Sequence, residues 1–98
     1  MPNTPGQIGR GVTAYSSEQP LEDALLHSIE SILGALGIVY KVPENQLDAV
    51  TAVSGSGPAY VFEFIEALTD AGVQAGLEET LALSLAKETV LGLSLIHI

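Results

Sequence analysis

The 98-residue sequence contains no cysteine and only three basic residues. Without cysteine the chain can form neither a disulfide scaffold nor a thiolate metal site, and it has no thiol nucleophile. Twelve acidic residues give it a formal net charge of −9 at pH 7. Binding to a nucleic-acid backbone or to an anionic membrane surface requires clustered lysine and arginine, which this chain lacks. The composition therefore excludes nucleic acids and membrane surfaces as partners.

Long apolar runs are also absent. The longest apolar run, residues 32–40, is far shorter than the roughly 20 residues of a membrane-spanning helix. The first ten residues lack the apolar segment of a secretory leader, so we expect a cytoplasmic protein. The hydrophobic content is nevertheless 47% and the charged content only 15%, which predicts a folded core. A chain this short buries only about 60–65% of its unfolded surface, so some apolar surface is expected to meet a partner.

Two short strands and one helix are predicted within the first 42 residues. Residues 12–15 and 38–42 are rich in β-forming side chains, which predicts the strands. The stretch Ser16–Pro20, with hydroxyls, an early acid and a proline, is typical of a helix start. Apolar residues then recur at three- and four-residue steps, which predicts an amphipathic helix ended by Gly34 or Gly37. The apolar stripe consists of Leu21, Ala24, Leu25, Ile29, Ile32, Leu33 and Leu36.

The remainder of the chain is predicted to be helical. A helix over about 44–53 is expected to stop at Ser54–Gly57, because glycine and serine disfavour a helix interior. Pro58 suits the first turn of a second helix, which is expected to run until Gly76 breaks it. A third helix, opened by two acidic residues, is predicted over 78–90. The predicted fold class is therefore mostly α, with a short α/β edge followed by helices.

Two glycine-containing strings match functional motifs without the context that those motifs need. Residues 9–14 fit G-x-G-x-x-A, but a loop precedes them and a strand follows, whereas a dinucleotide fingerprint follows a strand and opens a helix. Ser56 is not in a nucleophile elbow, because Ser54 and Pro58 stand where that motif requires glycine. Neither histidine has metal-ligating residues at a suitable spacing. The residues thus predict no catalytic nucleophile and no metal site.

The turn at residues 54–58 is a candidate anion-binding site. Unpaired amides at the start of a helix, together with nearby hydroxyls, can hold a carboxylate. The alternative is an ordinary capped turn between two helices. The groups in question are the amides of Ala59 and Tyr60 and the hydroxyls of Thr51, Ser54 and Ser56.

Four segments occur in an order that identifies a family. They are Met1–Pro5, Gly11–Ala14, the run D-A-V-T-A-V-S-G-S-G-P-A-Y-V-F at Asp48–Phe62, and Ile65–Val73. This series closely resembles pyrroline-5-carboxylate reductase, the last enzyme of proline biosynthesis. The resemblance covers roughly residues 1–92, and the run at Asp48–Phe62 is its most specific part.

The resemblance implies an oxidoreductase that uses NADPH or NADH to reduce the C=N bond of 1-pyrroline-5-carboxylate, which gives L-proline. In this family a Rossmann domain binds the cofactor. A helical domain, similar to the C-terminal helical fold of 6-phosphogluconate dehydrogenase, pairs with a second subunit to form a homodimer or a higher homo-oligomer. We therefore expect residues 1–42 to be the end of the Rossmann domain and residues 43–98 to begin the dimerisation domain.

The resemblance also implies which residues form the site. A hydride acceptor with a C=N bond needs no protein nucleophile, so none of them is expected to be catalytic in that sense. Cofactor binding is implied for Met1, Pro2, Asn3, Thr4 and Pro5, and substrate binding for Thr51, Ser54, Gly55, Ser56, Gly57 and Pro58.

The sequence departs from the family in three ways. The glycine-rich first turn of the Rossmann domain does not occur in it, and neither does the family's later serine-proline-glycine-glycine-threonine segment. The tail Leu93–Ile98 does not continue the family pattern. We therefore expect an interior fragment that is inactive on its own. One alternative is a stand-alone helical self-association module without catalytic activity, and another is a different Rossmann dehydrogenase with a helical second domain.

Overall fold

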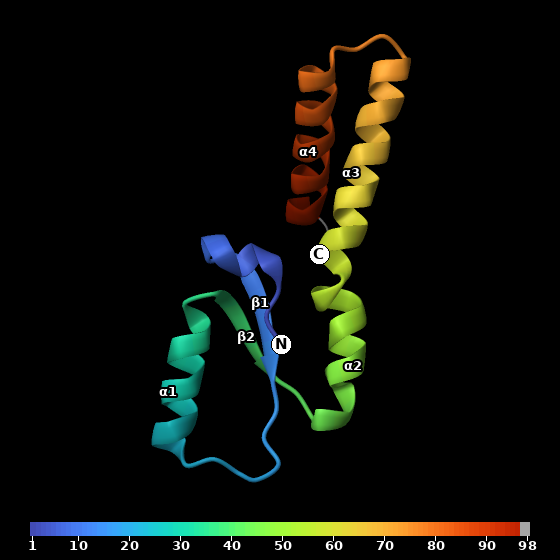
Figure 1. Ribbon diagram of the computed structural model, residues 1–98. Coiled ribbons are helices and arrows are strands. Elements are labelled where there is room, and N and C mark those ends of the chain that lie inside the picture. The colour runs from blue at the N-terminus through green and yellow to red at the C-terminus, as the bar shows by residue number, and fades with distance from the viewer. Residues whose placement is uncertain (97–98) are drawn as a thin grey trace. The chain divides into compact units, whose positions relative to one another are not determined.

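The computed structural model describes residues 1–96 and divides into two compact units, residues 1–58 and residues 59 onward. A two-stranded parallel sheet with helices around it forms the first unit, and a helical hairpin forms the second (Figure 1). This mostly helical composition confirms the predicted fold class. The first unit contains η1 (Thr4–Ile8), β1 (Gly11–Tyr15), α1 (Asp23–Gly34), β2 (Gly37–Lys41), η2 (Glu44–Gln46), α2 (Leu47–Val50) and the π-helical turn η3 (Thr51–Gly55).

Strands β1 and β2 pair in parallel, with Gly11 opposite Gly37 and Tyr15 opposite Lys41. Parallel neighbours need a crossover connection, which α1 supplies. The middle of β1 is the interior of this unit, where Ala14 is only 3% exposed. Both predicted strands are confirmed to within one residue at each end.

Helix α1 begins at Asp23, so the helix start predicted within Ser16–Pro20 is wrong. The two serine hydroxyls of that stretch are used elsewhere, since the first donates to the side chain of Glu44 and the second to the carbonyl of Gln19. Neither hydroxyl is therefore left to cap a helix. The residue at the actual N-cap, Glu22, makes no side-chain capping hydrogen bond.

The apolar stripe of α1 is also displaced from the predicted one. Leu25 and Ile32 are 50% and 73% exposed, although both were expected to face inward. Gly34 is the last helical residue, as predicted, whereas Gly37 opens β2 and does not end the helix. The half-buried apolar residues of the helix are Leu26, Ile29 and Leu33.

Tyr15, at the end of β1, ties the strand to α1. Its phenol donates a hydrogen bond to Glu30 Oε1 over 2.6 Å. This hydrogen bond, assisted by desolvation and by the negative charge of Glu30, raises the pKa of Tyr15 to about 12. The sheet and its crossover helix are thus held together at their exposed edge by a neutral phenol.

From Ala59 on, α3 (Gly57–Gln74) forms the second unit together with α4 (Glu79–Ile96), and the two helices run antiparallel (Figure 1). Gly76 lies between them with a φ of 108°, a backbone conformation that favours glycine. The predicted helices over 58–75 and 78–90 are confirmed, and α4 continues through Ile96. The described part of the tail Leu93–Ile98 is therefore helical, and its last two residues lie outside the described range.

Small side chains let α3 and α4 approach each other closely. A Cβ atom at Gly72 would lie 3.1 Å from the Cβ of Ala82. Thr69 of α3 is buried beside them, together with Ala82 and Ala86 of α4. No helix within residues 1–96 has both the length and the apolar character needed to cross a membrane.

At the starts of the two strands the backbones approach so closely that Gly37 has no room for a side chain. A Cβ atom there would lie 2.0 Å from the carbonyl oxygen of Gly11, and the φ of Gly37 is 139°. The amide of Gly11 donates to the carbonyl of Leu36 over 2.8 Å. This close approach of the two backbones fixes the position at which the chain after η1 enters the sheet.

We predict that Gly37→Ala destabilises the chain by at least about 2 kcal/mol, because the added methyl group would overlap backbone atoms at a strained φ. Gly34→Ala is the matched control. A Cβ atom at Gly34 meets nothing within 4 Å, so this change should be neutral or stabilising by up to about 1 kcal/mol. Thermal unfolding followed by circular dichroism measures both, and equal melting temperatures for the two variants would refute the prediction.

Candidate functional site

The first three residues run beside β1 and are hydrogen-bonded to it. The nitrogen of Met1 donates to the carbonyl of Ala14 over 3.0 Å, and the amide of Ala14 donates back to the carbonyl of Met1 over 3.1 Å. Reciprocal bonds of this kind are those of an antiparallel pair. The segment predicted to bind the cofactor is therefore attached to the sheet through its backbone.

Asn3 connects this segment to the turn predicted to bind the substrate. Its side-chain oxygen accepts the amide hydrogen of Val12 in β1 over 2.9 Å. Its side-chain nitrogen donates to the carbonyl of Ser54 in η3 over 3.1 Å, across 51 positions of sequence. Both polar groups of this amide are thus used inside the protein.

Thr51 supplies a second connection between the same two segments. Its hydroxyl donates to the carbonyl of Leu47 over 3.0 Å and lies 3.4 Å from the sulfur of Met1. Met1 and Asn3 from one predicted segment therefore meet Thr51 and Ser54 from the other. The two sets of residues named by the sequence resemblance lie together within the first unit.

The break predicted at Ser54–Gly57 is confirmed at Ser56, a bend that lies between η3 and α3. The backbone continues through Gly55 in a π-helical turn, in which the amide of Ser56 donates to the carbonyl of Thr51 over 2.7 Å. Only Ser56 departs from the helical pattern, as a bend with right-handed φ and ψ of −90° and −18°. Widening the turn by one residue accommodates the disturbance that a following proline causes.

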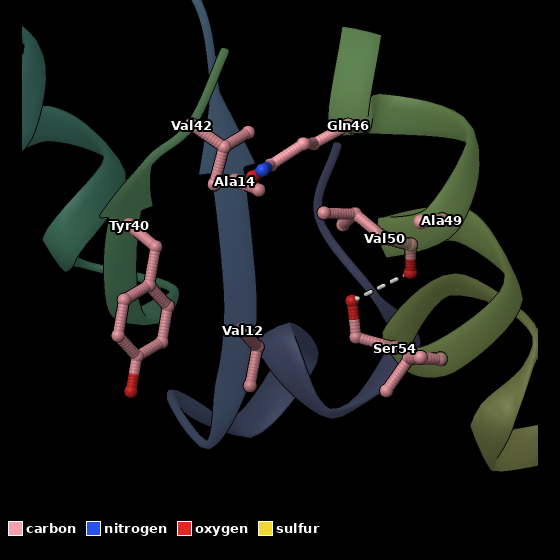
Figure 2. Close-up of a pocket in the computed structure, with 9 residues that line it drawn as sticks. Val12, Ala14, Tyr40, Val42, Gln46, Ala49, Val50 and Ser54 are labelled. Atoms are coloured by element: carbon pink, nitrogen blue, oxygen red, sulfur yellow. Dashed lines mark hydrogen bonds between the residues drawn. The ribbon is translucent and has the colours of Figure 1, made fainter. Parts of the chain in front are cut away.

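The three hydroxyls of the turn differ in what they can offer a ligand. Those of Thr51 and Ser54 donate to the backbone carbonyls four residues earlier, and Figure 2 shows the bond from Ser54 to Val50. Within residues 1–96 the hydroxyl of Ser56 has no hydrogen-bond partner. Ser56 is therefore the hydroxyl best able to donate to an incoming carboxylate.

A hollow of about 480 Å³, which we name the loop pocket, opens where the two segments meet. Three residues of the predicted cofactor segment and one of the predicted substrate turn line it. The other three were missed by sequence reasoning, because they line the pocket only through the packing of η1 against Leu36, in the turn between α1 and β2. The lining residues are Pro2, Asn3, Thr4, Gly6, Gln7, Leu36 and Gly55.

A second hollow, also of about 480 Å³, lies between the sheet and the α2–η3 segment (Figure 2). Its walls are mostly aliphatic, and Figure 2 shows Val12 and Ala14 of β1 on one side with Val50 on the other. The sequence did not predict this apolar hollow. It is lined by Val12, Ala14, Tyr40, Val42, Gln46, Ala49, Val50, Val53 and Ser54.

Metal-ligating side chains do not gather anywhere in the described part of the chain, where no group of three or more histidine, cysteine or acidic residues could hold an ion. His27 is exposed on α1. Pro58 lies in the first turn of α3, as predicted, and so do the amides of Ala59 and Tyr60.

A parallel strand pair with a crossover helix, followed by long helices, defines the class as an α/β edge followed by a helical hairpin. Residues 44–97 match the family model described as pyrroline-5-carboxylate reductase dimerisation. The chain therefore belongs to the pyrroline-5-carboxylate reductase dimerisation family. The matched range includes most of the tail 93–98 that the sequence pattern had set apart.

Curated relatives extend the similarity to nearly the whole chain. A pyrroline-5-carboxylate reductase from Synechocystis is 53% identical over 92 residues, which cover 94% of this chain and 34% of the relative. One from Mycobacterium tuberculosis is 49% identical over 92 residues, covering 94% of this chain and 31% of the relative. This chain thus spans about a third of the length of these relatives.

Solved structures show the same fold. The pyrroline carboxylate reductase of Plasmodium falciparum, determined with NADP bound, is 40% identical with a TM-score of 0.88. The match covers 94% of this chain and 37% of that one. The Streptococcus pyogenes 1-pyrroline-5-carboxylate reductase has a TM-score of 0.91 at 34% identity, over 96% of this chain and 36% of its own.

Proposed function

We propose that this chain is the part of a pyrroline-5-carboxylate reductase that joins the cofactor domain to the dimerisation domain. Residues 1–42 then end the NAD(P)H-binding domain, and residues 43–98 begin the helical one. The observation that carries the proposal is the hydrogen bond between Asn3 and Ser54, which joins the two segments that the family resemblance links to cofactor and substrate. The family match over residues 44–97 supports it independently.

The reaction adds a hydride to the carbon of the C=N bond of 1-pyrroline-5-carboxylate and a proton to its nitrogen, which gives L-proline. The reduced nicotinamide, NADPH or NADH, supplies the hydride when it is bound and is itself oxidised. The loop pocket fits the nicotinamide end of such a cofactor, because Gly6 and Gly55 contribute no side chains to its wall while Thr4 and Gln7 supply polar groups. A glycine-rich strand–turn–helix for the pyrophosphate does not occur among the 98 residues.

The residues of this chain act in the proposal by binding and orientation. The free hydroxyl of Ser56 donates to the substrate carboxylate, and the first amides of α3 assist through the positive end of the helix. Thr51, Ser54, Gly55, Gly57 and Pro58 shape the turn that presents this hydroxyl. Hydride transfer needs close alignment of donor and acceptor, so correct placement is the main contribution that such residues make.

The proposal includes a homodimer or a larger homo-oligomer formed through the helical part. Large apolar side chains on α3 remain open to solvent, with Tyr60, Phe62 and Phe64 each more than half exposed. The only buried apolar residues found in residues 1–96 are Ala14, Ala82 and Ala86. Exposed apolar surface of this extent is typical of an association interface. The same surface favours the second candidate, a helical self-association module without catalysis.

A chimera separates the two candidates. In it, this chain replaces the matching 34% of the Synechocystis reductase. We predict that the chimera oxidises NADPH or NADH in the presence of 1-pyrroline-5-carboxylate. The 98-residue chain alone should not do so, because the glycine-rich cofactor-binding loop of the chimera comes from the Synechocystis part. A folded, oligomeric chimera without turnover would contradict the reductase proposal and favour the self-association module.

Within the chimera, we predict that Ser56→Ala raises the KM for pyrroline-5-carboxylate about tenfold or more, since a hydrogen bond to a charged group is lost. Thr51→Val should act in the same direction but more weakly, because the Thr51 hydroxyl already donates to Leu47. The KM for the cofactor should stay within about twofold. Ser28→Ala, which removes a helical hydroxyl bonded to Ala24 in α1, is the control. Equal changes in both KM values after Ser56→Ala would contradict the assignment.

A further inference from the structure

The carbonyl of Ser54 lacks the partner that a continuous α-helix would give it. In an α-helix each carbonyl accepts the amide hydrogen of the residue four positions later. For Ser54 that residue is Pro58, which has no amide hydrogen and whose ring crowds the same carbonyl. The π-helical turn η3 and the bend at Ser56 lie directly before this proline. A partly buried carbonyl without a donor is costly, and a side chain from elsewhere in the chain can supply one.

Asn3 provides that donor from the other predicted segment. Its side-chain nitrogen lies 3.1 Å from the Ser54 oxygen, while its side-chain oxygen accepts from Val12 over 2.9 Å. Because one partner is a donor and the other an acceptor, only one orientation of the amide satisfies both. The side chain is thereby held between β1 and the turn with a defined geometry.

We propose that Asn3 is a positioning residue, which sets the distance between the cofactor-side segment, residues 1–5, and the substrate-side turn, residues 51–58, by replacing the hydrogen bond that Pro58 cannot make. The inference rests on the proposed reductase function. Both polar groups of the Asn3 amide are occupied within the protein, so its effect on turnover is exerted through Ser54. The sulfur of Met1, 3.4 Å from the Thr51 hydroxyl, gives a second contact at the same junction.

Loss of the hydrogen bond between Asn3 and Ser54 should change the alignment of cofactor and substrate more than the affinity for either. Each ligand keeps most of its own contacts when the two segments shift relative to one another. Hydride transfer, however, depends on the distance between cofactor and substrate, and a misplacement of about 1 Å can lower a rate about a hundredfold. The kcat should therefore respond more strongly than either KM.

The test uses Asn3→Asp in the chimera described above. Aspartate keeps an oxygen for the Val12 amide but offers no hydrogen to Ser54, and its carboxylate repels that carbonyl. We expect kcat to fall about ten- to a hundredfold while both KM values change less than about threefold. Asn45→Asp, the same charge change at an exposed position of η2, is the matched control and should leave kcat unchanged. A kcat within twofold of the parent chimera would overturn the proposal, and so would a loss of kcat that only follows the fraction of folded protein.

A second measurement does not depend on turnover. Pro58→Ala restores an amide hydrogen at position 58, which can satisfy the Ser54 carbonyl directly. The drop in Tm caused by Asn3→Ala should therefore be clearly smaller in the Pro58→Ala background than in the parent chimera. Additive shifts would show that Asn3 does not replace the missing bond and would overturn the proposal. If the parent chimera folds but has no activity, the proposed reductase function is refuted. The comparison of Tm values with and without each substitution still tests the role of Asn3.

Discussion

The missing amide hydrogen of Pro58 is the constraint on which the candidate site depends. A proline at this position cannot donate to the Ser54 carbonyl, and the helix before it is widened into a π-helical turn. The side chain of Asn3, 51 residues earlier in the chain, donates a hydrogen bond to that carbonyl. The contact joins residues 1–5 to residues 51–58, and both segments contribute to the wall of the loop pocket.

Apolar exposure is the second general feature of the chain. Its hydrophobic content is 47%, yet the helices of the described residues bury mainly alanines and leave side chains such as Phe62 and Leu95 60% and 71% exposed. The chain spans about a third of the length of the relatives it matches. The dimerisation family to which it belongs supplies a reason for such surface on helices.

Much of the fold could be predicted from periodicity and from glycine and proline, because these signals are local. The strands near residues 12–15 and 38–42, the turn at Gly76 and the position of Pro58 in the first turn of α3 follow from them. The start of α1 could not be predicted, because the serines before it hydrogen-bond to Glu44 and Gln19. Glycine and serine correctly predicted the break at Ser56, but the π-helical turn before it was missed, because the contact of Ser54 with Asn3 comes from a distant part of the sequence.

The site residues came from a family resemblance rather than from physical spacing, and their roles remain proposals. What the sequence could not indicate is that Asn3 lies against Ser54, since no local pattern relates positions 3 and 54. The most direct test is a crystal structure of the chimera with NADP and L-proline bound. The account predicts that the Asn3 side-chain nitrogen donates to the Ser54 carbonyl and its oxygen accepts from Val12, with both ligands beside this junction. An Asn3 amide turned away from Ser54, with that carbonyl bonded to water, would contradict it.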